Sequence, residues 1–281
     1  MIGKNHNYQG VNHTTPRIDS HAHFDEIYDT GIQEIMRQEG VSVISWAYIS
    51  KPPVTLTGIK EYFEKQQERC DRGRKYGISI YRLIGIHPRS IPKVYTQVKD
   101  INASEITTLL ENAYQPKDVV GIGETGLETI NDVEKRIFEI HLELAQKKNL
   151  PVCIHTPRSN KTKITEIILS ILDNYKLPAN HILIDHIVDT NILAKVLDRG
   201  YYAGITLSNS KSSIAEAVAM IQKHKKNVSR IMINSDVVTN DPDEYKVFLD
   251  IKKHLNIETE HVLEKTARRF YNLPLLSKKV K

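Results

Sequence analysis

The sequence predicts a single-domain α/β protein built as a (β/α)8 barrel, the TIM-barrel architecture. Short apolar segments alternate eight times with stretches of helical period along the chain. The apolar segments lack strict polar alternation, as expected of parallel strands that are covered on both faces. The length of 281 residues fits one large barrel of this kind. A doubly wound α/β fold shows the same alternation and is the nearest alternative.

The expected strands are eight short runs of mainly apolar residues. Each run is bounded by turn-forming or charged residues, and each is followed by a stretch in which a helix is expected. In chain order the expected strands are residues 17–21, 41–47, 78–87, 119–124, 151–155, 181–186, 201–206 and 230–236.

The stretches between these strands carry apolar residues at helical spacing. Ile35 and Met36 precede Gly40, which is a helix-ending residue. A longer pattern ends at the Asn-Leu-Pro break over residues 149–151. The apolar positions of that longer pattern are Val133, Ile137, Ile140 and Leu144.

Two segments extend the simple barrel pattern. The connection over residues 90–117 is longer than a loop requires, and residues 1–16 precede the first strand. We therefore expect an N-terminal extension over residues 1–16 and a barrel domain over residues 17–281. The composition supports a globular chain, because 40% of the residues are hydrophobic and 26% are charged.

Composition also bears on location and partners. No stretch approaches the run of about 20 apolar residues that crosses a bilayer, and the polar start lacks the apolar centre of an export signal. Cys70 and Cys153 are expected to be buried, inert thiols, which fits a cytoplasmic protein without a membrane partner. The net charge of +5 permits attraction to phosphate-bearing partners. The basic clusters at residues 223–226 and 278–281 are interpreted as solvated helix ends or tail.

Potential metal ligands fall at the ends of the expected strands. In (β/α)8 barrels the carboxyl ends of the strands form the functional face, so these side chains should meet at one mouth. The spacing agrees with this architecture. Glu124 to His155 and His155 to His186 are 31 residues each, which is one strand-helix unit, and His186 to Asp236 is 50 residues, which is two units. The candidates are His21, His23, Glu124, His155, His186 and Asp236.

The residue types in this set indicate a centre of two divalent metal ions. His21 and His23 are two residues apart and share one face of a strand, so both can reach a single ion. Nitrogen and carboxylate donors suit Zn²⁺, Mn²⁺, Fe²⁺ or Ni²⁺ better than Mg²⁺ or Ca²⁺, although the identity of the ions, Mg²⁺ included, stays open. Six ligands exceed the three protein ligands of one catalytic ion, which favours two ions sharing a carboxylate.

Each candidate also has a simpler interpretation. A His-x-His pair occurs by chance, Glu124 could be a loop carboxylate, and His186 beside Asp185 could be a core histidine. The coincidence of six such residues at strand ends favours the site. The other histidines are assigned to the surface or to helix packing, and they are His6, His13, His141, His181, His224, His254 and His261.

Three further residues are candidates for contact with substrate. His87 ends the third strand before Pro88 and is expected to touch substrate or to support the ligands. Arg158 and Lys161 follow His155 and could clamp an anionic group, or they could be solvated loop charges.

At these positions the chain resembles the TatD-related metal-dependent hydrolases of the amidohydrolase-like superfamily. The motifs that carry the resemblance are SHAHFDE, GIHP, GIGETGLE, PVCIHT, IDH and NSD, in this order. It covers nearly the whole chain after residue 16. It implies that His21, His23 and Asp236 hold one metal ion, that His155 and His186 hold the other, and that Glu124 bridges them. It also places His87 near the substrate phosphate.

The chain departs from that family at several motif positions. Thr125 and Glu128 stand in a segment where the family usually reads Gly-Glu-Ile-Gly-Leu-Asp. Residues 187–189 replace the Cys-Phe-Ser/Thr-Gly that follows the strand-six histidine, and Asn234 stands where the family commonly has Glu. These departures indicate a divergent branch of the family. The family's metal centre can be inferred for this chain, whereas the family's substrate cannot.

The leading hypothesis is a phosphodiesterase or deoxyribonuclease that uses a metal-activated water. Asp236 would orient or deprotonate that water, and Glu124 would set the separation of the ions at about 3.5–4 Å. A phosphate-containing substrate such as DNA is implied by the resemblance, while the oligomeric state stays open. An alternative is hydrolysis of a small ester, lactone, amide or phosphate. It is kept because the sequence shows no run of aromatic residues interleaved with basic ones that could bind single-stranded DNA. A non-catalytic binding barrel with a structural metal is the third hypothesis.

Overall fold

The computed structural model describes residues 17–97, 101–256 and 258–274. The predicted N-terminal extension over residues 1–16, with His6 and His13, lies outside the described residues. The basic cluster at residues 278–281 lies outside them as well.

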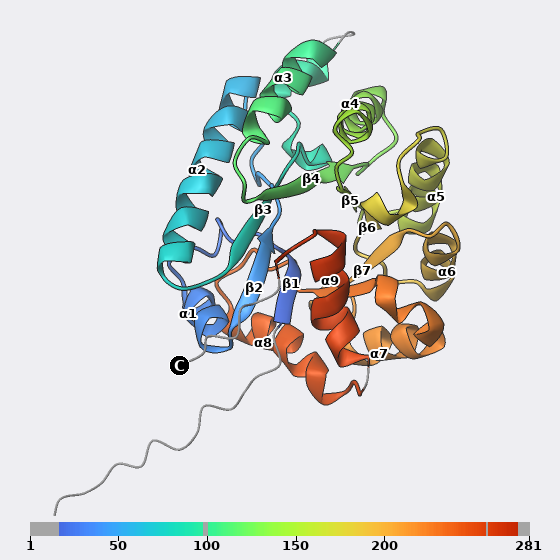
Figure 1. Ribbon diagram of the computed structural model, residues 1–281. Helices are drawn as coiled ribbons and strands as arrows, with labels where there is room; N and C mark the ends of the chain where they lie inside the picture. The colour runs from blue at the N-terminus through green and yellow to red at the C-terminus, as the bar shows by residue number, and fades with distance from the viewer. Residues whose placement is uncertain (1–16, 98–100, 257, 275–281) are drawn as a thin grey trace, which may run out of the picture.

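Eight parallel strands form one sheet in the order of the chain, from β1 to β8 (Figure 1). The Asp236 N–H donates to the His21 carbonyl across the β8–β1 seam at 2.8 Å. This sequential order is that of a (β/α)8 barrel and not of a doubly wound sheet, so the predicted fold class is confirmed. The strands are β1 (Arg17–Ala22), β2 (Val41–Ser45), β3 (Ile80–Ile84), β4 (Val119–Gly126), β5 (Val152–His155), β6 (Ile182–Ile184), β7 (Tyr202–Thr206) and β8 (Ile231–Asn234).

Helices surround the strands, as Figure 1 shows. They are α1 (Gly31–Gln38), α2 (Leu56–Lys75), α3 (Ala103–Ala113), α4 (Asp132–Lys148), α5 (Lys161–Leu172), α6 (Thr190–Asp198), α7 (Ile214–Lys223), α8 (Pro242–Asp250) and α9 (Thr266–Phe270). The long connection predicted over residues 90–117 contains α3 and the short 3₁₀ turn Lys93–Gln97. Helix α4 ends at Asn149, whose left-handed backbone (φ 54°) stops the helix where the sequence predicts a break.

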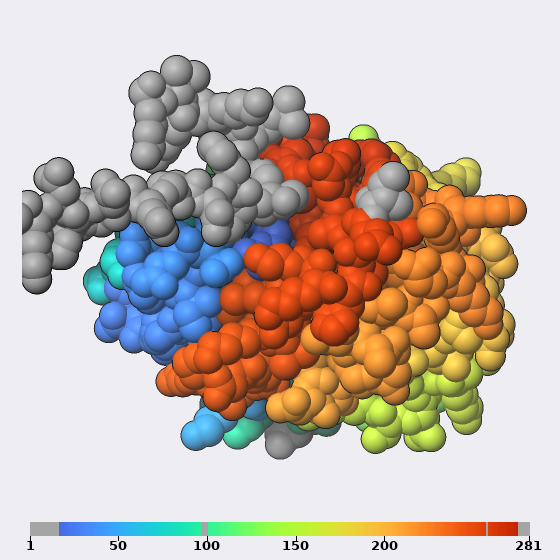
Figure 2. Space-filling model, turned by 90° about the horizontal axis from the view of Figure 1, so that it is seen from below, coloured from blue at the N-terminus to red at the C-terminus, as the bar shows by residue number. Residues whose placement is uncertain are grey.

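The core has two layers. The larger one lies between the strands and the surrounding helices, and the smaller one fills the barrel interior. The interior layer includes Ile44, Leu83, Leu183 and Met232, all fully buried, and α9 adds Phe270 to it. In Figure 2 the C-terminal part of the chain, in red and orange, lies beside the blue N-terminal part. The interior layer supports the strand ends that carry the candidate site.

Several strands are shorter or longer than the sequence predicts. Glu124 lies inside β4 rather than at its end, because the strand continues to Gly126. A side chain at Gly126 (φ +145°) would meet the His155 carbonyl at 2.5 Å, so only glycine lets β4 run this close to β5. His186 and Asp236 lie two residues beyond β6 and β8, because their left-handed backbones (φ 59° and 51°) leave the ladder.

The residues assigned to packing or to the surface differ in burial. Cys70, Cys153 and His141 are buried, whereas His181, His224 and His261 are half-buried and His254 is exposed. Cys70 on α2 and Cys153 on β5 are buried free thiols, as predicted. His141 on α4 is also buried: its Nδ1 lies 2.7 Å from the Ile137 carbonyl, and its Nε2 accepts from the Ile86 N–H at 2.9 Å. Among the residues that the structure describes, no helix is long and apolar enough to cross a membrane.

Replacing Leu183 by Ala should destabilise the barrel. Leu183 is 0% exposed in the interior layer, so truncation leaves a cavity and lowers the free energy of unfolding by about 2–5 kcal/mol. Urea denaturation measures the loss. Val54→Ala is the control, because Val54 is 66% exposed and its truncation should change stability by about 0.5 kcal/mol or less. Equal effects of the two substitutions would contradict this description of the core.

His141 should make the fold sensitive to acid. Burial lowers the pKa of His141 to about 4, from an ordinary value of 6.5. The unfolded chain therefore binds the extra proton first as pH falls. Stability contributed by the neutral ring is complete above pH 6.5 and is lost progressively down to pH 4, by about 3 kcal/mol. Denaturation of wild type and His141→Gln across this range should show a shallower pH dependence in the variant, and parallel curves would refute this role.

Candidate metal centre

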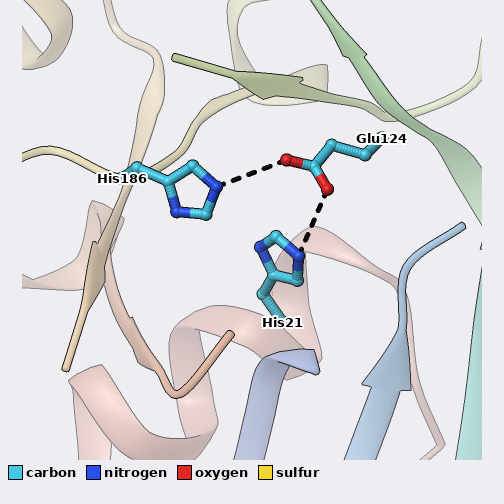
Figure 3. Close-up of side chains that lie close together, drawn as sticks. All are labelled: His21, Glu124 and His186. Atoms are coloured by element: carbon cyan, nitrogen blue, oxygen red, sulfur yellow. Dashed lines mark hydrogen bonds and ion pairs between the residues drawn. The ribbon is translucent and has the colours of Figure 1, made fainter. Parts of the chain in front are cut away.

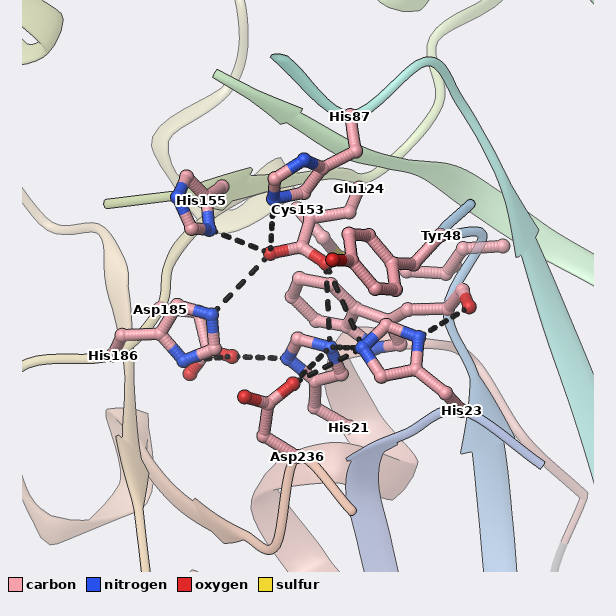
Figure 4. Close-up of polar contacts among 12 residues, drawn as sticks. His21, His23, Tyr48, His87, Glu124, Cys153, His155, Asp185, His186 and Asp236 are labelled. Carbon is pink, nitrogen blue, oxygen red and sulfur yellow. Dashed lines mark hydrogen bonds and ion pairs between the residues drawn. The ribbon is translucent and has the colours of Figure 1, made fainter. Parts of the chain in front are cut away.

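The six predicted ligands converge at the carboxyl ends of the strands (Figure 4). They come from β1 and the residue after it, from β4 and β5, and from the segments that follow β6 and β8. Glu124 lies between His21 and His186, as Figure 3 shows. One oxygen of Glu124 thus faces a ring nitrogen from β1, and the other faces one from the segment after β6.

One group of ligands consists of His21, His23 and Asp236. The Nε2 atoms of the two histidines are 3.2 Å apart. Asp236 Oδ1 lies 3.2 Å from His21 Nε2 and 3.1 Å from His23 Nε2. Three donor atoms therefore surround one point, which is the arrangement that a bound cation requires.

The second group is centred on Glu124. Its Oε1 lies 2.7 Å from His155 Nδ1 and 3.3 Å from His186 Nε2. Its Oε2 lies 3.5 Å from His21 Nε2, in the first group. Glu124 therefore connects the two groups through its two oxygens.

Outer partners fix the orientation of the histidine rings. His23 Nδ1 donates to the Trp46 carbonyl at 3.0 Å, and His21 Nδ1 donates to Asp185 Oδ2 at 2.5 Å. His155 Nε2 donates to Glu128 Oε2 at 2.9 Å. In each ring the other nitrogen points to the centre, so the outer partner selects which nitrogen can bind a metal.

The buried carboxylates and imidazole nitrogens of the centre are stabilised by positive charge between them. Burial alone would lower the pKa of His21, but the carboxylates of Asp236 and Glu124 raise it to about 10. Burial would raise the pKa of Glu124, but the charge on His21 and the hydrogen bonds from His155 and His186 hold it well below its usual range. Without a metal ion, a proton on His21 therefore supplies charge that divalent cations would otherwise bring. The donor set, imidazole nitrogens with carboxylate oxygens, fits ions of the Zn²⁺ or Mn²⁺ type.

His87 lies beside the centre as a neutral hydrogen-bond donor. Burial lowers the pKa of His87 well below its usual value, so the ring is uncharged. The Arg89 backbone N–H donates to His87 Nδ1 at 2.9 Å, which places the ring proton on Nε2. That Nε2 lies 3.6 Å from Glu124 Oε1. The predicted position of His87 at the site is therefore matched by a geometry that can donate to substrate.

Lys211 is a residue of the site that sequence reasoning missed. It follows β7, and its ammonium binds Asp236 Oδ2 and lies 2.9 Å from His186 Nδ1. Burial would raise the pKa of Asp236, but Lys211, His21 and His186 lower it well below its usual range. The signal was a lysine in the loop after the seventh strand, the loop that faces the same mouth.

The two other predicted substrate contacts differ in position. Arg158 is exposed and lines the pocket over the centre. Lys161 begins α5, and its ammonium binds the Thr156 carbonyl and hydroxyl and the His186 carbonyl. The described structure thus directs Lys161 to the loop backbone instead of the pocket mouth.

The pocket over the centre is narrow. Its volume is about 50 Å³, which is room for a few water molecules. Besides the candidate ligands, its wall includes His87, Arg158 and Lys211, together with Tyr48 and Arg89. The Arg89 guanidinium lies 5.2 Å from the Tyr48 ring and 3.7 Å from Glu128. Only the reacting group of a substrate fits inside.

Comparisons with known proteins agree with this geometry. The profile of the TatD-related DNase family matches residues 18–270. An uncharacterized metal-dependent hydrolase of Methanocaldococcus jannaschii is 28% identical over 269 residues, which is 91% of this chain and 100% of the relative. A TatD-like protein of Archaeoglobus fulgidus has a TM-score of 0.69 at 28% identity, over 91% of this chain and 99% of its own.

A more distant solved structure shares the fold. The phosphotriesterase homology protein of Escherichia coli, crystallised with phosphate in its active site, has a TM-score of 0.67 at 14% identity. The match covers 92% of this chain and 99% of that protein. At this identity the likeness concerns the barrel alone.

Divalent metal should stabilise the chain if the six donors form a cation site. Adding Zn²⁺ to chelator-treated protein at about 1,000 times its Kd should raise the free energy of unfolding by about 4 kcal/mol, because the ion binds only the folded chain. Thermal melting with and without Zn²⁺ measures the shift. In Glu124→Ala the carboxylate that connects both groups is lost, so the shift should shrink. An equal rise in both proteins would place the binding elsewhere.

Proposed function

The chain belongs to the TatD-related DNase family, and on that premise we propose that this metal-dependent hydrolase cleaves phosphodiester bonds, those of DNA in particular, at a centre of two divalent ions. The observation that carries the proposal is the meeting of four imidazoles and two carboxylates beneath a cationic rim. The rim consists of Arg89 and Arg158, and the nearly buried Lys211 adds a positive charge beside Asp236 below it. A positive rim over a metal centre suits an anionic substrate.

The geometry supports a definite division of ligands. His21, His23 and Asp236 would hold one ion. His155 and His186, which both contact Glu124 Oε1, would hold the other. Glu124 would bridge, because its oxygens face both groups. Divalent ions in such a centre activate water and neutralise the charge that develops on the attacked group.

The chain's own residues divide the remaining work. Asp236 Oδ1 faces the metal ligands, while Lys211 binds Oδ2 and fixes the carboxylate plane, so Oδ1 is the atom that would orient and deprotonate the water. His87 Nε2–H would donate to a phosphoryl oxygen. Arg89 and Arg158 would bind the negative charges that remain outside the narrow pocket.

One observation favours a second candidate, a hydrolase of small esters, lactones, amides or phosphates. The pocket of about 50 Å³ admits only a reacting group, and the described wall offers Tyr48 as its single aromatic ring besides the imidazoles. A polynucleotide would therefore have to bind outside this pocket, without a row of stacking rings within it. The cationic rim still favours a phosphate ester over a neutral ester.

The test is a substrate panel on metal-reconstituted protein. Single-stranded DNA, a phosphodiester of p-nitrophenol, a phosphomonoester, a carboxylic ester and a lactone are each assayed with Zn²⁺, Mn²⁺ and Mg²⁺. DNA and the phosphodiester should be cleaved with a higher kcat/KM than the neutral substrates. Intact DNA under every metal, with turnover of a small substrate, would select the second candidate.

In the same assays Glu124→Ala and Asp236→Ala should abolish turnover while the proteins stay folded. The first substitution removes the carboxylate between the two ligand groups, and the second removes the proposed proton acceptor. Glu166→Ala is a matched control, because Glu166 forms an exposed ion pair with Lys195 on α6 and should keep full activity. Full activity in both site variants would contradict the residue roles.

A further inference from the structure

Three residues on neighbouring strands form a buried arrangement just beneath the centre. Asp185 follows β6, Gly204 lies in β7 and Asn234 ends β8. The Asp185 side chain is 0% exposed. Its Oδ2 accepts from His21 Nδ1 at 2.5 Å, as Figure 4 shows. Its Oδ1 accepts from the Asn234 side-chain amide at 2.8 Å. Both carboxylate oxygens are therefore committed, one to a candidate metal ligand and one to a support.

Gly204 provides the space for this carboxylate. A Cβ atom at position 204 would lie 1.8 Å from Asp185 Oδ1 and 3.1 Å from the Asn234 side-chain nitrogen. No side chain can therefore occupy this position while Asp185 and Asn234 keep their places. The three residues form one unit, which we call the Asp185 clamp.

The clamp accounts for the departure from the family pattern at Asn234. A carboxylate at position 234 would face the Asp185 carboxylate at hydrogen-bond distance, and like charges so close in a buried site repel. An amide instead donates a hydrogen bond to Asp185. The choice of Asn234 and the presence of a buried acid at position 185 are thus complementary.

His21 is held from two directions. Its ring stacks on Trp46 with centroids 3.7 Å apart and planes at 7°, and its Nδ1–H is bound by Asp185. The only ring nitrogen left is Nε2, which faces His23, Glu124 and Asp236. A carboxylate behind a metal-binding imidazole fixes its orientation and makes the opposite nitrogen a stronger donor.

We propose that Asp185, held by Asn234 over Gly204, is a positioning residue that sets the metal affinity of His21. The inference rests on the proposed metal centre and adds to it a specific outer partner. Its effect on a bound ion passes through the His21 ring, which lies between the two.

The chain offers a nearly isosteric test. In Asp185→Asn the new side-chain oxygen can still accept from His21 Nδ1, and the new amide nitrogen needs an acceptor. Asn234 can supply it by turning its amide, because its Oδ1 has no hydrogen-bond partner within the described part of the chain. Asp185→Asn therefore keeps both hydrogen bonds and removes the charge alone.

The experiment compares full-length wild type, Asp185→Asn and a control, all treated with chelator and titrated with Zn²⁺ by calorimetry and with Co²⁺ by visible absorption. Asp185→Asn should weaken one of the two Zn²⁺ binding steps, that of the site containing His21, about 10- to 100-fold and alter the Co²⁺ spectrum. Asp189→Asn is the control, because Asp189 only caps α6 by accepting from the backbone of residues 191 and 192. It should bind both ions as wild type does.

Two outcomes separate the possible failures. Wild-type metal affinity in Asp185→Asn, with or without a lower melting temperature, would overturn the clamp inference and leave the proposed function standing. A wild type that binds neither Zn²⁺ nor Co²⁺ would overturn the metal centre itself, and the inference with it.

Two further variants test the geometry. Asp185→Asn combined with Asn234→Asp keeps a carboxylate in the clamp but moves it away from His21, so affinity should stay as low as in Asp185→Asn. Recovery of wild-type affinity would overturn direct action on His21. Gly204→Ala should lower Zn²⁺ affinity by displacing Asp185. If Gly204→Ala does not fold, the nearly isosteric Asp185→Asn still decides.

Discussion

The rest of the structure depends on one electrostatic constraint, which is that four imidazoles and two carboxylates face one another in a buried mouth. Burying carboxylate oxygens and unprotonated ring nitrogens so that they face one another costs free energy unless positive charge lies between them. The chain meets the demand partly by itself, since the pKa of His21 rises to about 10 and Lys211 binds Asp236. Divalent ions bound at this site would meet it more fully, because they carry more positive charge than a proton or an ammonium group. The buried charges that cost folding free energy would then be the ones that give the site its affinity for metal.

Barrel geometry explains how so many polar groups can meet without loss of the core. The interior layer below the site is apolar and continuous, so the polar groups are confined to the strand ends. Strain is confined there as well: His186 and Asp236 adopt left-handed backbones, which cost about 1 kcal/mol or more each in non-glycine residues. Backbone bonds from the Asp236 N–H to His21 and from the Ile187 N–H to Gly204 hold these turns. The regular strands and helices thus support the two irregular turns that orient His186 and Asp236 toward the centre.

The sequence predicts the convergence of the six candidate side chains, because strand ends are local signals that a parallel barrel collects on one face. His21 and His155 illustrate this, since periodicity alone places them correctly. Positions set by long-range packing are not predictable in this way. Lys211 follows a strand without any candidate ligand, and Lys161 turns its ammonium to the backbone of Thr156. The sequence marks Asp185 only as a neighbour of His186, because its contact with His21 spans 164 residues of chain.

The small pocket over the centre can hold only the reacting group of a substrate, so the rest of the substrate must contact the surrounding loops. About 50 Å³ above the centre holds the group that reacts, so the centre itself cannot distinguish substrates by their bulk. Discrimination must then come from the loops around it. Arg89 lines this pocket and also a larger hollow of about 450 Å³ beside it, whose wall includes Ile91 and Thr96. Because Arg89 belongs to both, a substrate whose charged group enters the centre would meet the larger hollow next. On the proposed function, the candidate metal ligands would therefore set the class of reaction, whereas the loops after β3 and β4 would contribute to the choice of substrate.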